Sequence, residues 1–376
     1  MTTLRAEALA QMSRLKLLTL WNLNFSGSLD FLSSELGYLC WDKYPFTCLP
    51  SSFVADKLVE LVLPRSNIRQ LWVGTKVLKT WSFLAFVKEA NQSLNKIINL
   101  CLSIFHCLQS LHNLTHLNLS HSKNLIMMPN FFEIPNLELL DLEGCLKLVQ
   151  IDPSICMLKR LSELNLKDCK NLVSIPNNNF DLSSLIRLNL SGCPNLPNNK
   201  LLEGKGQTEH LEMLDNKEST TRYQLTSFIY KVLKPHFGFS IFAKQEDSVG
   251  LSLPLLSRFP YLQYLDLSFC NLIQIPDAIG WLHCLEILNL GGNNFVTLPS
   301  MKELSKLREF NLEHCKQLKY LPELPSKTVL PERKSSFGLT SGLYIFDCPS
   351  LIDVERCYRM AFSWMILVYI SLMGLN

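Results

Sequence analysis

A leucine pattern that returns every 22 to 24 residues constrains the fold of this chain more than any other feature. Its form is L-x-x-L-x-L-x-x-C/N, usually followed by x-x-L-x-x-hydrophobic-Pro. Clear copies begin at Leu114, Leu137, Leu161, Leu185, Leu262, Leu285 and Leu307, and weaker copies begin at Leu15, Leu36 and Leu58. So many copies at one spacing indicate a repeat architecture rather than a chance arrangement of leucines.

The x-L-x-L-x part of each copy alternates between leucine and other residues, which predicts a short strand with its leucines on one side. A single coil cannot bury those leucines, so the coils must stack into a continuous core. The spacing matches that of leucine-rich repeats. The pattern therefore predicts an α/β fold: a leucine-rich-repeat solenoid, or horseshoe, with a parallel β-sheet on its concave face.

Two segments interrupt the array. The step from Leu58 to Leu114 is 56 residues, and removing residues 77–110 leaves 22, which is one repeat. This apolar, out-of-register segment is either a real insertion or a retained intron. Residues 198–261 carry no convincing copy, so we expect an irregular insertion there. The predicted organisation is N-terminal repeats at 1–76, further repeats at 111–197 and 262–325, insertions at 77–110 and 198–261, and a different unit at 326–376.

Charge and cysteine content narrow the class of protein. The 36 basic and 33 acidic residues give a formal net charge of +3 without a basic tract, so nothing favours nucleic acid as a partner. The 13 cysteines include no CxxC pair, which argues against a disulfide framework or a zinc ribbon. The start of the chain lacks the apolar stretch of a signal peptide, and the apolar C-terminal stretch is shorter than the about 20 residues of a membrane span. We expect a cytoplasmic or nucleo-cytoplasmic protein, with membrane association as the less favoured alternative.

Motifs of catalysis and cofactor binding are missing. The sequence contains no P-loop, HExxH, GxSxG or protein-kinase signature, so we expect no enzyme activity, no cofactor and no metal. Five cysteines nevertheless recur at one repeat position: Cys145, Cys169, Cys193, Cys270 and Cys315. They suggest either a metal or redox ladder or, as we favour, small residues buried at the turn after each strand.

The outward-facing positions of the predicted strands form the candidate partner-binding site. The middle position is Asn or Asp in every clear copy, which suggests a preference of the scaffold. The positions on either side vary in charge and shape, as a rigid protein-binding surface requires, although an ordinary solvated face would also carry such residues. The candidate contact residues are His116, Asp141, Glu143, Glu163, Lys167, Arg187, Tyr264, Glu309 and Glu313.

Several runs resemble the leucine-rich-repeat region of plant intracellular disease resistance proteins. The class in question has an N-terminal Toll/interleukin-1-receptor domain and a nucleotide-binding module, as in proteins similar to tobacco mosaic virus resistance protein N. The runs are Leu36-Gly37-Tyr38-Leu39, Lys57-Leu58-Val59-Glu60-Leu61, Leu142-Glu143-Gly144-Cys145 and Tyr320-Leu321-Pro322-Glu323-Leu324-Pro325. Cys348-Pro349 and Glu355-Arg356-Cys357 look like the start of the family's C-terminal jelly-roll or immunoglobulin-like domain. By this resemblance, 326–376 is a linker followed by a truncated remnant of that domain.

The resemblance implies a non-catalytic module that binds a protein, namely a pathogen effector or a host protein modified by one. It also implies a regulatory contact with the nucleotide-binding module of a receptor, in cis or in trans. Neither that module nor the Toll/interleukin-1-receptor domain is present in this sequence, so no catalytic residue carries over. Two alternatives stay open: a truncated non-functional or decoy product of a degenerate resistance gene, and a membrane-anchored receptor-like ectodomain.

Overall fold

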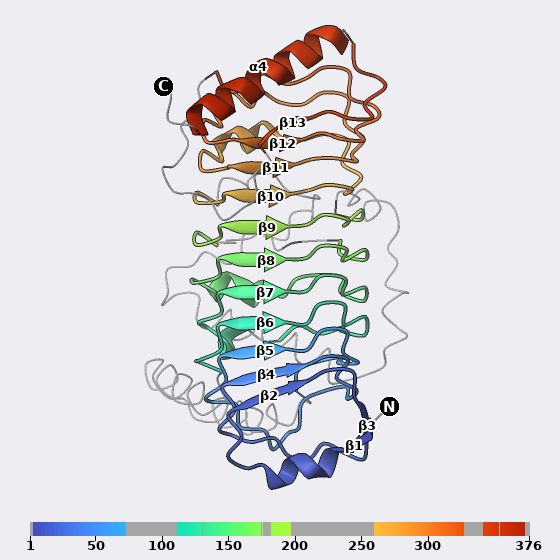
Figure 1. The fold of residues 1–376 in the computed structure, drawn as a ribbon, viewed down its shortest axis with the longest axis vertical. Coiled ribbons are helices and arrows are strands. Elements are labelled where there is room, and N and C mark those ends of the chain that lie inside the picture. The colour runs from blue at the N-terminus through green and yellow to red at the C-terminus, as the bar shows by residue number, and fades with distance from the viewer. Residues whose placement is uncertain are drawn as a thin grey trace, which may run out of the picture.

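A computed structural model describes a stack of coils that all wind in the same sense (Figure 1). The described residues are 3–72, 111–129, 131–173, 175, 182–196, 259–326, 341–352 and 354–372. The insertion predicted at 77–110, and all but the last three residues of the one predicted at 198–261, lie outside the described residues.

One parallel sheet of eleven strands runs the length of the stack, and each strand pairs only with its neighbours in chain order. Its strands are β2 (Leu17–Leu20), β4 (Tyr38–Trp41), β5 (Glu60–Val62), β6 (His116–Asn118), β7 (Leu139–Asp141), β8 (Glu163–Asn165), β9 (Arg187–Asn189), β10 (Tyr264–Asp266), β11 (Ile287–Asn289), β12 (Glu309–Asn311) and β13 (Gly342–Tyr344). This sheet confirms the predicted leucine-rich-repeat solenoid, including the three weaker N-terminal copies.

Shorter elements complete the described coils. Two strands, β1 (Thr3–Arg5) and β3 (Asn24–Ser26), form a separate parallel pair at the N-terminal end of the stack (Figure 1). Between strands the chain makes short 3-10 helices; they are η1 (Ala6–Gln11), η2 (Phe131–Glu133), η3 (Pro153–Met157) and η7 (Asp277–Trp281). The C-terminal end carries the helix α4 (Val354–Leu372).

The sheet continues in register across both interruptions of the repeat. Glu60 of β5 lies opposite His116 of β6, although residues 77–110 intervene in the sequence. Arg187 of β9 lies opposite Tyr264 of β10, across the residues between 198 and 261. The repeats on either side of each interruption therefore belong to one continuous core, as stacking of leucine columns requires.

Inward-facing leucines fill the interior of every coil. The central column is Leu39, Leu61, Leu117, Leu140, Leu164, Leu188, Leu265, Leu288 and Phe310, and every member is buried. Full burial of one such side chain stabilises the fold by about 1.5–3 kcal/mol. Each side chain is covered by the equivalent residue of the coils above and below, so the stabilisation depends on unbroken stacking.

The recurrent cysteines form a buried ladder at the turn after each strand. The thiol of Cys193 donates to the carbonyl of Leu166 at 3.1 Å, and that of Cys270 donates to the carbonyl of Leu190 at 3.0 Å. Burial raises the pKa of the Cys169 thiol to about 12, which keeps it protonated as a donor. The thiols therefore serve as packed donors between coils, which agrees with the structural interpretation of this position.

Asn293 takes the same place in the β11 coil. Its Nδ2 donates to the carbonyls of Leu267 and Leu290 at 2.9 and 2.7 Å, and its Oδ1 accepts the N–H of Cys270 and of Leu272 at 3.2 and 3.0 Å. An amide thus satisfies more backbone groups than a thiol does. Cysteine and asparagine are alternatives here because both are small and both donate to a carbonyl of the coil before.

Each strand of the long sheet is followed by a residue in the left-handed region, with φ between +54° and +70°. Glycine occupies this turn position in three of these coils. In each of the three, the side chain of the turn residue in the preceding coil lies over the glycine. A Cβ added to Gly192, for example, would come within 2.4 Å of Asp168 Oδ1. The N–H of Asp168 in turn donates to the carbonyl of Ser191 at 2.7 Å. These turns form one edge of the concave face.

The array extends one coil beyond Leu324-Pro325, where the sequence pattern ends. Leu343 of β13 lies opposite Phe310 of β12, and the Cys348 thiol donates to the carbonyl of Leu312 at 3.1 Å, as in the ladder. The described residues of 326–376 form one further solenoid coil and a helix, and the assignment of this part to a remnant of a C-terminal domain stays a prediction. The pattern missed this coil because Thr340 stands where the first leucine would be.

Helix α4 packs on β13 and covers the last strand of the sheet (Figure 1). Its buried residues are Cys357, Ala361, Trp364 and Val368, a spacing that places them on one helical face. The helix thereby covers an edge whose unpaired backbone groups would otherwise template pairing with another chain. None of the helices in the described ranges combines the length and apolarity needed to span a membrane.

We expect Asn293→Ala to lower the free energy of unfolding by about 2–4 kcal/mol, because buried carbonyl and N–H groups lose their partner. Asn293→Cys should cost less, because a thiol fills this place in the neighbouring coils. Urea denaturation followed by circular dichroism measures both. Equal losses for the two variants would contradict the equivalence of thiol and amide at this position.

A second variant tests the left-handed turns. Gly192→Ala should destabilise the protein by about 1–2 kcal/mol for the left-handed conformation alone, and further through contact with Asp168. Asp168→Ala has a left-handed cost of its own, because Asp168 holds the same turn position in the preceding coil. The contact part is therefore the amount by which the double variant is more stable than the sum of the two single losses predicts. Denaturation of both single variants and the double variant measures the coupling, and strict additivity would show that the side chain of Asp168 does not lie over Gly192.

Candidate functional site

The concave face runs from β4 to β13, and each coil contributes three outward residues to it. Two of them flank the inward-facing central residue of the strand, and the third lies two places after the second. In the β8 coil, for example, these are Glu163, Asn165 and Lys167. All nine residues predicted as contacts lie on this face, on β6 to β10 and β12. Their positions are therefore as the repeat indicates, while their role in binding a partner stays a prediction.

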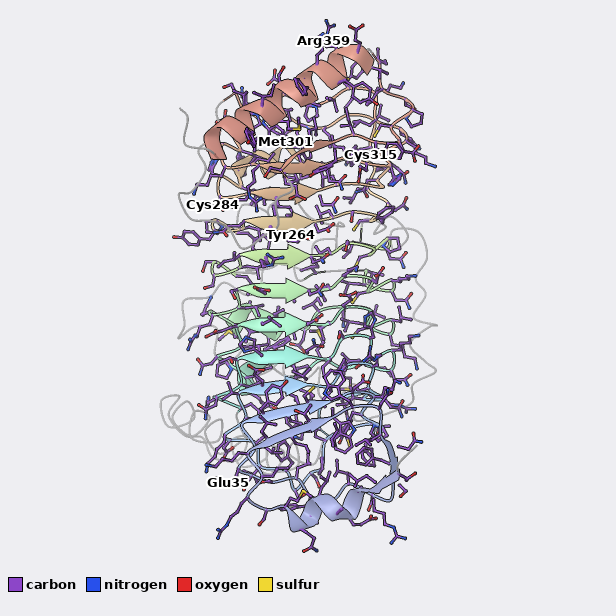
Figure 2. All side chains as sticks on the ribbon, viewed as in Figure 1. Glu35, Tyr264, Cys284, Met301, Cys315 and Arg359 are labelled. Carbon is purple, nitrogen blue, oxygen red and sulfur yellow. The ribbon has the colours of Figure 1, made fainter. Side chains whose placement is uncertain are left out.

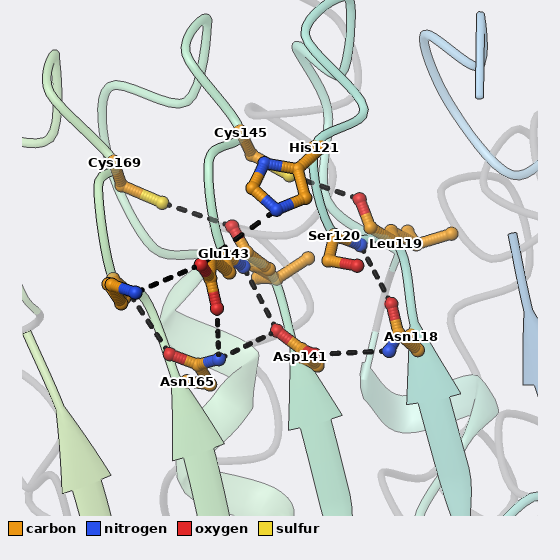
Figure 3. A network of polar contacts seen from close by, with 11 residues as sticks. Asn118, Leu119, Ser120, His121, Asp141, Glu143, Cys145, Asn165 and Cys169 are labelled. Atoms are coloured by element: carbon orange, nitrogen blue, oxygen red, sulfur yellow. Dashed lines mark hydrogen bonds and ion pairs between the residues drawn. The ribbon is translucent and has the colours of Figure 1, made fainter. Parts of the chain in front are cut away.

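The middle column of the concave face belongs to the scaffold. Asp141 Oδ1 accepts the N–H of Glu143 at 3.0 Å, and Asn118 Oδ1 accepts that of Ser120 at 2.9 Å (Figure 3). The amides of Asn118 and Asn165 each donate to a carboxylate oxygen of Asp141 at 3.0 Å. Burial raises the pKa of the Asp141 carboxyl. Of the nine predicted contacts, Asp141 is thus the one most engaged in holding coils together.

A charged cluster surrounds Glu143. Lys167 Nζ lies 3.3 Å from Glu143 Oε1. His121 Nε2 lies 3.8 Å from the same oxygen, and Asn165 Nδ2 donates to Glu143 Oε2 at 3.3 Å (Figure 3). The side chains of Lys167 and His121 are 44% and 47% exposed, so solvent screens these pairs strongly. The cluster presents charge to solvent without anchoring the fold. His116, on the neighbouring β6, contacts Thr115 through Nδ1 at 2.8 Å.

Arg187 and Tyr264 form a second cluster where β9 meets β10. The guanidinium carbon of Arg187 lies 4.5 Å from the ring centre of Tyr264, a cation–π arrangement, and its Nε lies 3.8 Å from Glu163 Oε2. The Tyr264 hydroxyl donates to Asp266 Oδ2 at 3.2 Å. Burial raises the pKa of Tyr264, so its hydroxyl stays protonated. Contacts at both the ring and the hydroxyl hold Tyr264, an aromatic side chain in the C-terminal half of the sheet (Figure 2).

The β12 coil carries two carboxylates on the concave face. Glu309 occupies the first column and contributes to the raised pKa of Tyr264, which places the two within electrostatic reach. Glu313 occupies the last column and accepts from Asn311 Nδ2 at 3.3 Å. Between β10 and β12, the β11 coil presents Ile287, which is buried, Asn289, which has the length of its neighbours Asp266 and Asn311, and Gly291, which has no side chain.

An exposed aromatic rim borders the C-terminal end of the face, and none of its residues is among the predicted contacts. The rings of Phe269 and His314 are 6.3 Å apart, and those of His314 and Phe346 are 6.2 Å apart. Phe269 is 57% and Phe346 is 71% exposed. His314 Nδ1 also lies 2.9 Å from Asp347 Oδ2. The sequence does place Phe269 and His314 at equivalent turn positions of their repeats. The alternation of inward and outward residues, however, does not mark that turn position as part of the surface.

Carboxylates dominate the charge of the concave face. Its acidic residues are Asp42, Glu60, Asp141, Glu143, Glu163, Asp266, Glu309 and Glu313, and its basic residues are Lys167 and Arg187. Both basic side chains already lie beside a carboxylate of the same face. The excess of negative charge contrasts with the formal net charge of +3 of the whole chain.

Comparison with known proteins supports the assignment of the chain as a leucine-rich-repeat protein. Residues 261–282 match the family model described as Leucine Rich Repeat. The chain is 30% identical over 370 residues to the disease resistance-like protein DSC1 of Arabidopsis thaliana, covering 81% of this chain and 28% of that protein. It is 29% identical over 360 residues to the TMV resistance protein N of Nicotiana glutinosa, covering 85% and 31% respectively. The chain thus spans less than a third of the length of the curated relatives it matches.

Among solved structures, the functional domain of InlJ from Listeria monocytogenes is similar with a TM-score of 0.44 and 16% identity, covering 83% of this chain and 51% of that one. Its description notes a cysteine ladder in that protein. For the present chain, the fold rests on its own sheet and the kinship rests on the plant relatives. The resemblance seen in the sequence holds over most of the chain, which belongs to the leucine-rich-repeat proteins of the plant disease resistance family.

Proposed function

We propose that this chain is a non-catalytic, protein-binding module of a plant innate immune receptor that acts in the cytoplasm. The observation that supports the proposal most is that one column of the concave face holds the scaffold together while the two columns beside it vary in side chain. The Asn and Asp side chains of the middle column hydrogen-bond within the scaffold, whereas the columns on either side carry charged, aromatic and aliphatic groups. A rigid surface of varied side chains suits recognition of another protein.

The proposed ligand is a pathogen effector or a host protein that an effector has modified. The same face, or its edge, would also contact the nucleotide-binding module of a receptor, in cis or in trans. A ligand that binds only when this contact is open shifts the population toward the open state by its difference in affinity for the two states. Recognition and regulation then follow from competition for one surface, without any chemical step on this chain.

The β8 to β10 cluster offers the sharpest test. Replacing Glu163, Arg187 and Tyr264 together by alanine should abolish capture of a protein partner, because anchors of the aromatic and arginine type supply most of the energy of an interface. The measurement is a two-hybrid screen of pathogen effectors and host proteins against the intact chain, repeated with the triple variant.

A matched control replaces Glu303, Lys319 and Tyr320 by alanine. These residues supply one acidic, one basic and one aromatic side chain, as the tested set does; they are exposed and lie off the concave face. Circular dichroism should show the solenoid intact in both triple variants. Partners that bind the concave variant as well as they bind the unmodified chain would overturn this assignment of the binding surface.

A further inference from the structure

Helix α4 carries a second apolar face beside the one that packs on β13. Tyr358, Phe362, Met365 and Tyr369 are 58%, 60%, 41% and 58% exposed. Their spacing of four, three and four residues places them in one line along the helix, which we call the α4 stripe. Single exposed apolar side chains are ordinary on a protein surface, whereas a continuous line of them marks an interaction site.

The spacing of the α4 stripe indicates what kind of element covers it. Apolar residues that alternate at intervals of three and four form the seam along which two helices pack side by side. Val354 and Ile366, which are 45% and 41% exposed, border the stripe and widen it. The stripe is therefore shaped to receive another helix.

The α4 stripe is complementary to itself when two copies of the helix lie antiparallel. A two-fold axis between Phe362 and Met365 places Phe362 of each copy opposite Met365 of the other, and Tyr358 opposite Tyr369. A thioether against an aromatic ring and a pair of aromatic rings are both favourable contacts. The tyrosines stand at the two ends of the seam, where their hydroxyls reach water. Such a contact uses the same surface on both copies and closes after two.

The charges of α4 favour the same arrangement. Glu355, Arg356 and Arg359 all lie in its first two turns, and residues 360–372 of the helix carry no charge. A parallel pair would bring the arginines of both copies together. In the antiparallel pair, the two copies of Arg359 are about 13 Å apart along the helix axis at 1.5 Å per residue. This separation exceeds the Debye length of about 8 Å, so solvent ions screen the repulsion.

The position and the size of the exposed surface suit a second copy of the chain. Helix α4 lies at the very end of the stack, beyond the last described coil (Figure 1). Because a whole aromatic side chain has about 200 Å² of surface, the three rings and their apolar neighbours expose roughly 500 Å². Two copies would bury on the order of 1,000 Å², which is the lower limit for a specific interface. We therefore expect a dimer that depends on concentration.

We propose that two copies of this chain associate end to end through antiparallel contact of their α4 stripes. This inference goes beyond the proposed function and does not rest on it. The candidate contact residues lie on β6 to β10 and β12, outside the α4 stripe, so the dimer would present two concave faces to a partner. A membrane surface suits the stripe less, because an interfacial helix carries lysine or arginine along its polar face.

The first test is sedimentation velocity of the full chain at rising concentration, which should show a species of twice the mass of the chain. The variant Phe362→Glu/Met365→Glu should weaken dimerisation by about a hundredfold, because apolar contacts are lost and carboxylates meet at the centre of the seam. The control Ile273→Glu/Trp281→Glu adds the same charges at residues that are 65% and 62% exposed on another part of the surface. It should dimerise as the unmodified chain does, and circular dichroism should show both variants folded.

The second test fixes the direction of the helices. A mixture of Tyr358→Cys and Tyr369→Cys chains should form a disulfide between these two positions under mild oxidation, found by mass spectrometry of the linked peptides. A disulfide between two copies of Tyr358→Cys would show parallel helices and overturn the proposal.

Three further outcomes would also overturn it. The first is an unmodified chain that stays monomeric at every concentration. The second is an equal loss of association in the Phe362→Glu/Met365→Glu variant and the control, which would show unspecific apolar contact. The third is a monomer that floats with vesicles of anionic phospholipid and loses this binding in the Phe362→Glu/Met365→Glu variant, which would assign the stripe to a membrane surface.

Discussion

Stacking of one coil on the next is the constraint on which the rest of this structure depends. A three-residue strand is too short to be stable alone, and its one central leucine is covered only when equivalent leucines lie on both sides. Backbone hydrogen bonds follow the same direction, from each coil to the next. The hydrophobic and polar contributions therefore require the same register, and that register aligns the outward side chains into columns.

This alignment explains how much the sequence reveals. The leucine spacing predicts the sheet, its direction and the face on which each candidate residue lies, because these follow from period alone. It does not reveal the pairing of Arg187 with Tyr264, because residues between 198 and 261 separate them and only the stacked register brings them together. The leucine pattern does not predict the coil at β13, because the first leucine of the repeat is replaced there. Its later inward positions still pack in the core.

The turn position after each strand shows a different limit. His121, Asp168 and Phe269 share a backbone conformation there but no side-chain chemistry, so no residue type marks the column in the sequence. The middle column is the opposite case. Asn and Asp recur there because one side-chain oxygen accepts the N–H two residues on, so their recurrence in the sequence is enough to predict a scaffold role. A structural position can be recognised in a repeat sequence when the same type of side chain recurs there. It cannot be recognised when only the backbone conformation recurs.

The buried thiol ladder has a consequence for how the molecule can be observed. Cys145, Cys169, Cys193, Cys270, Cys315 and Cys348 stand one to a coil, and burial suppresses the thiolate form that reacts with alkylating reagents. A thiol becomes reactive only when its own coil opens. The protein therefore carries a built-in set of reporters, and the order in which they are alkylated in the native state would trace where the solenoid opens first.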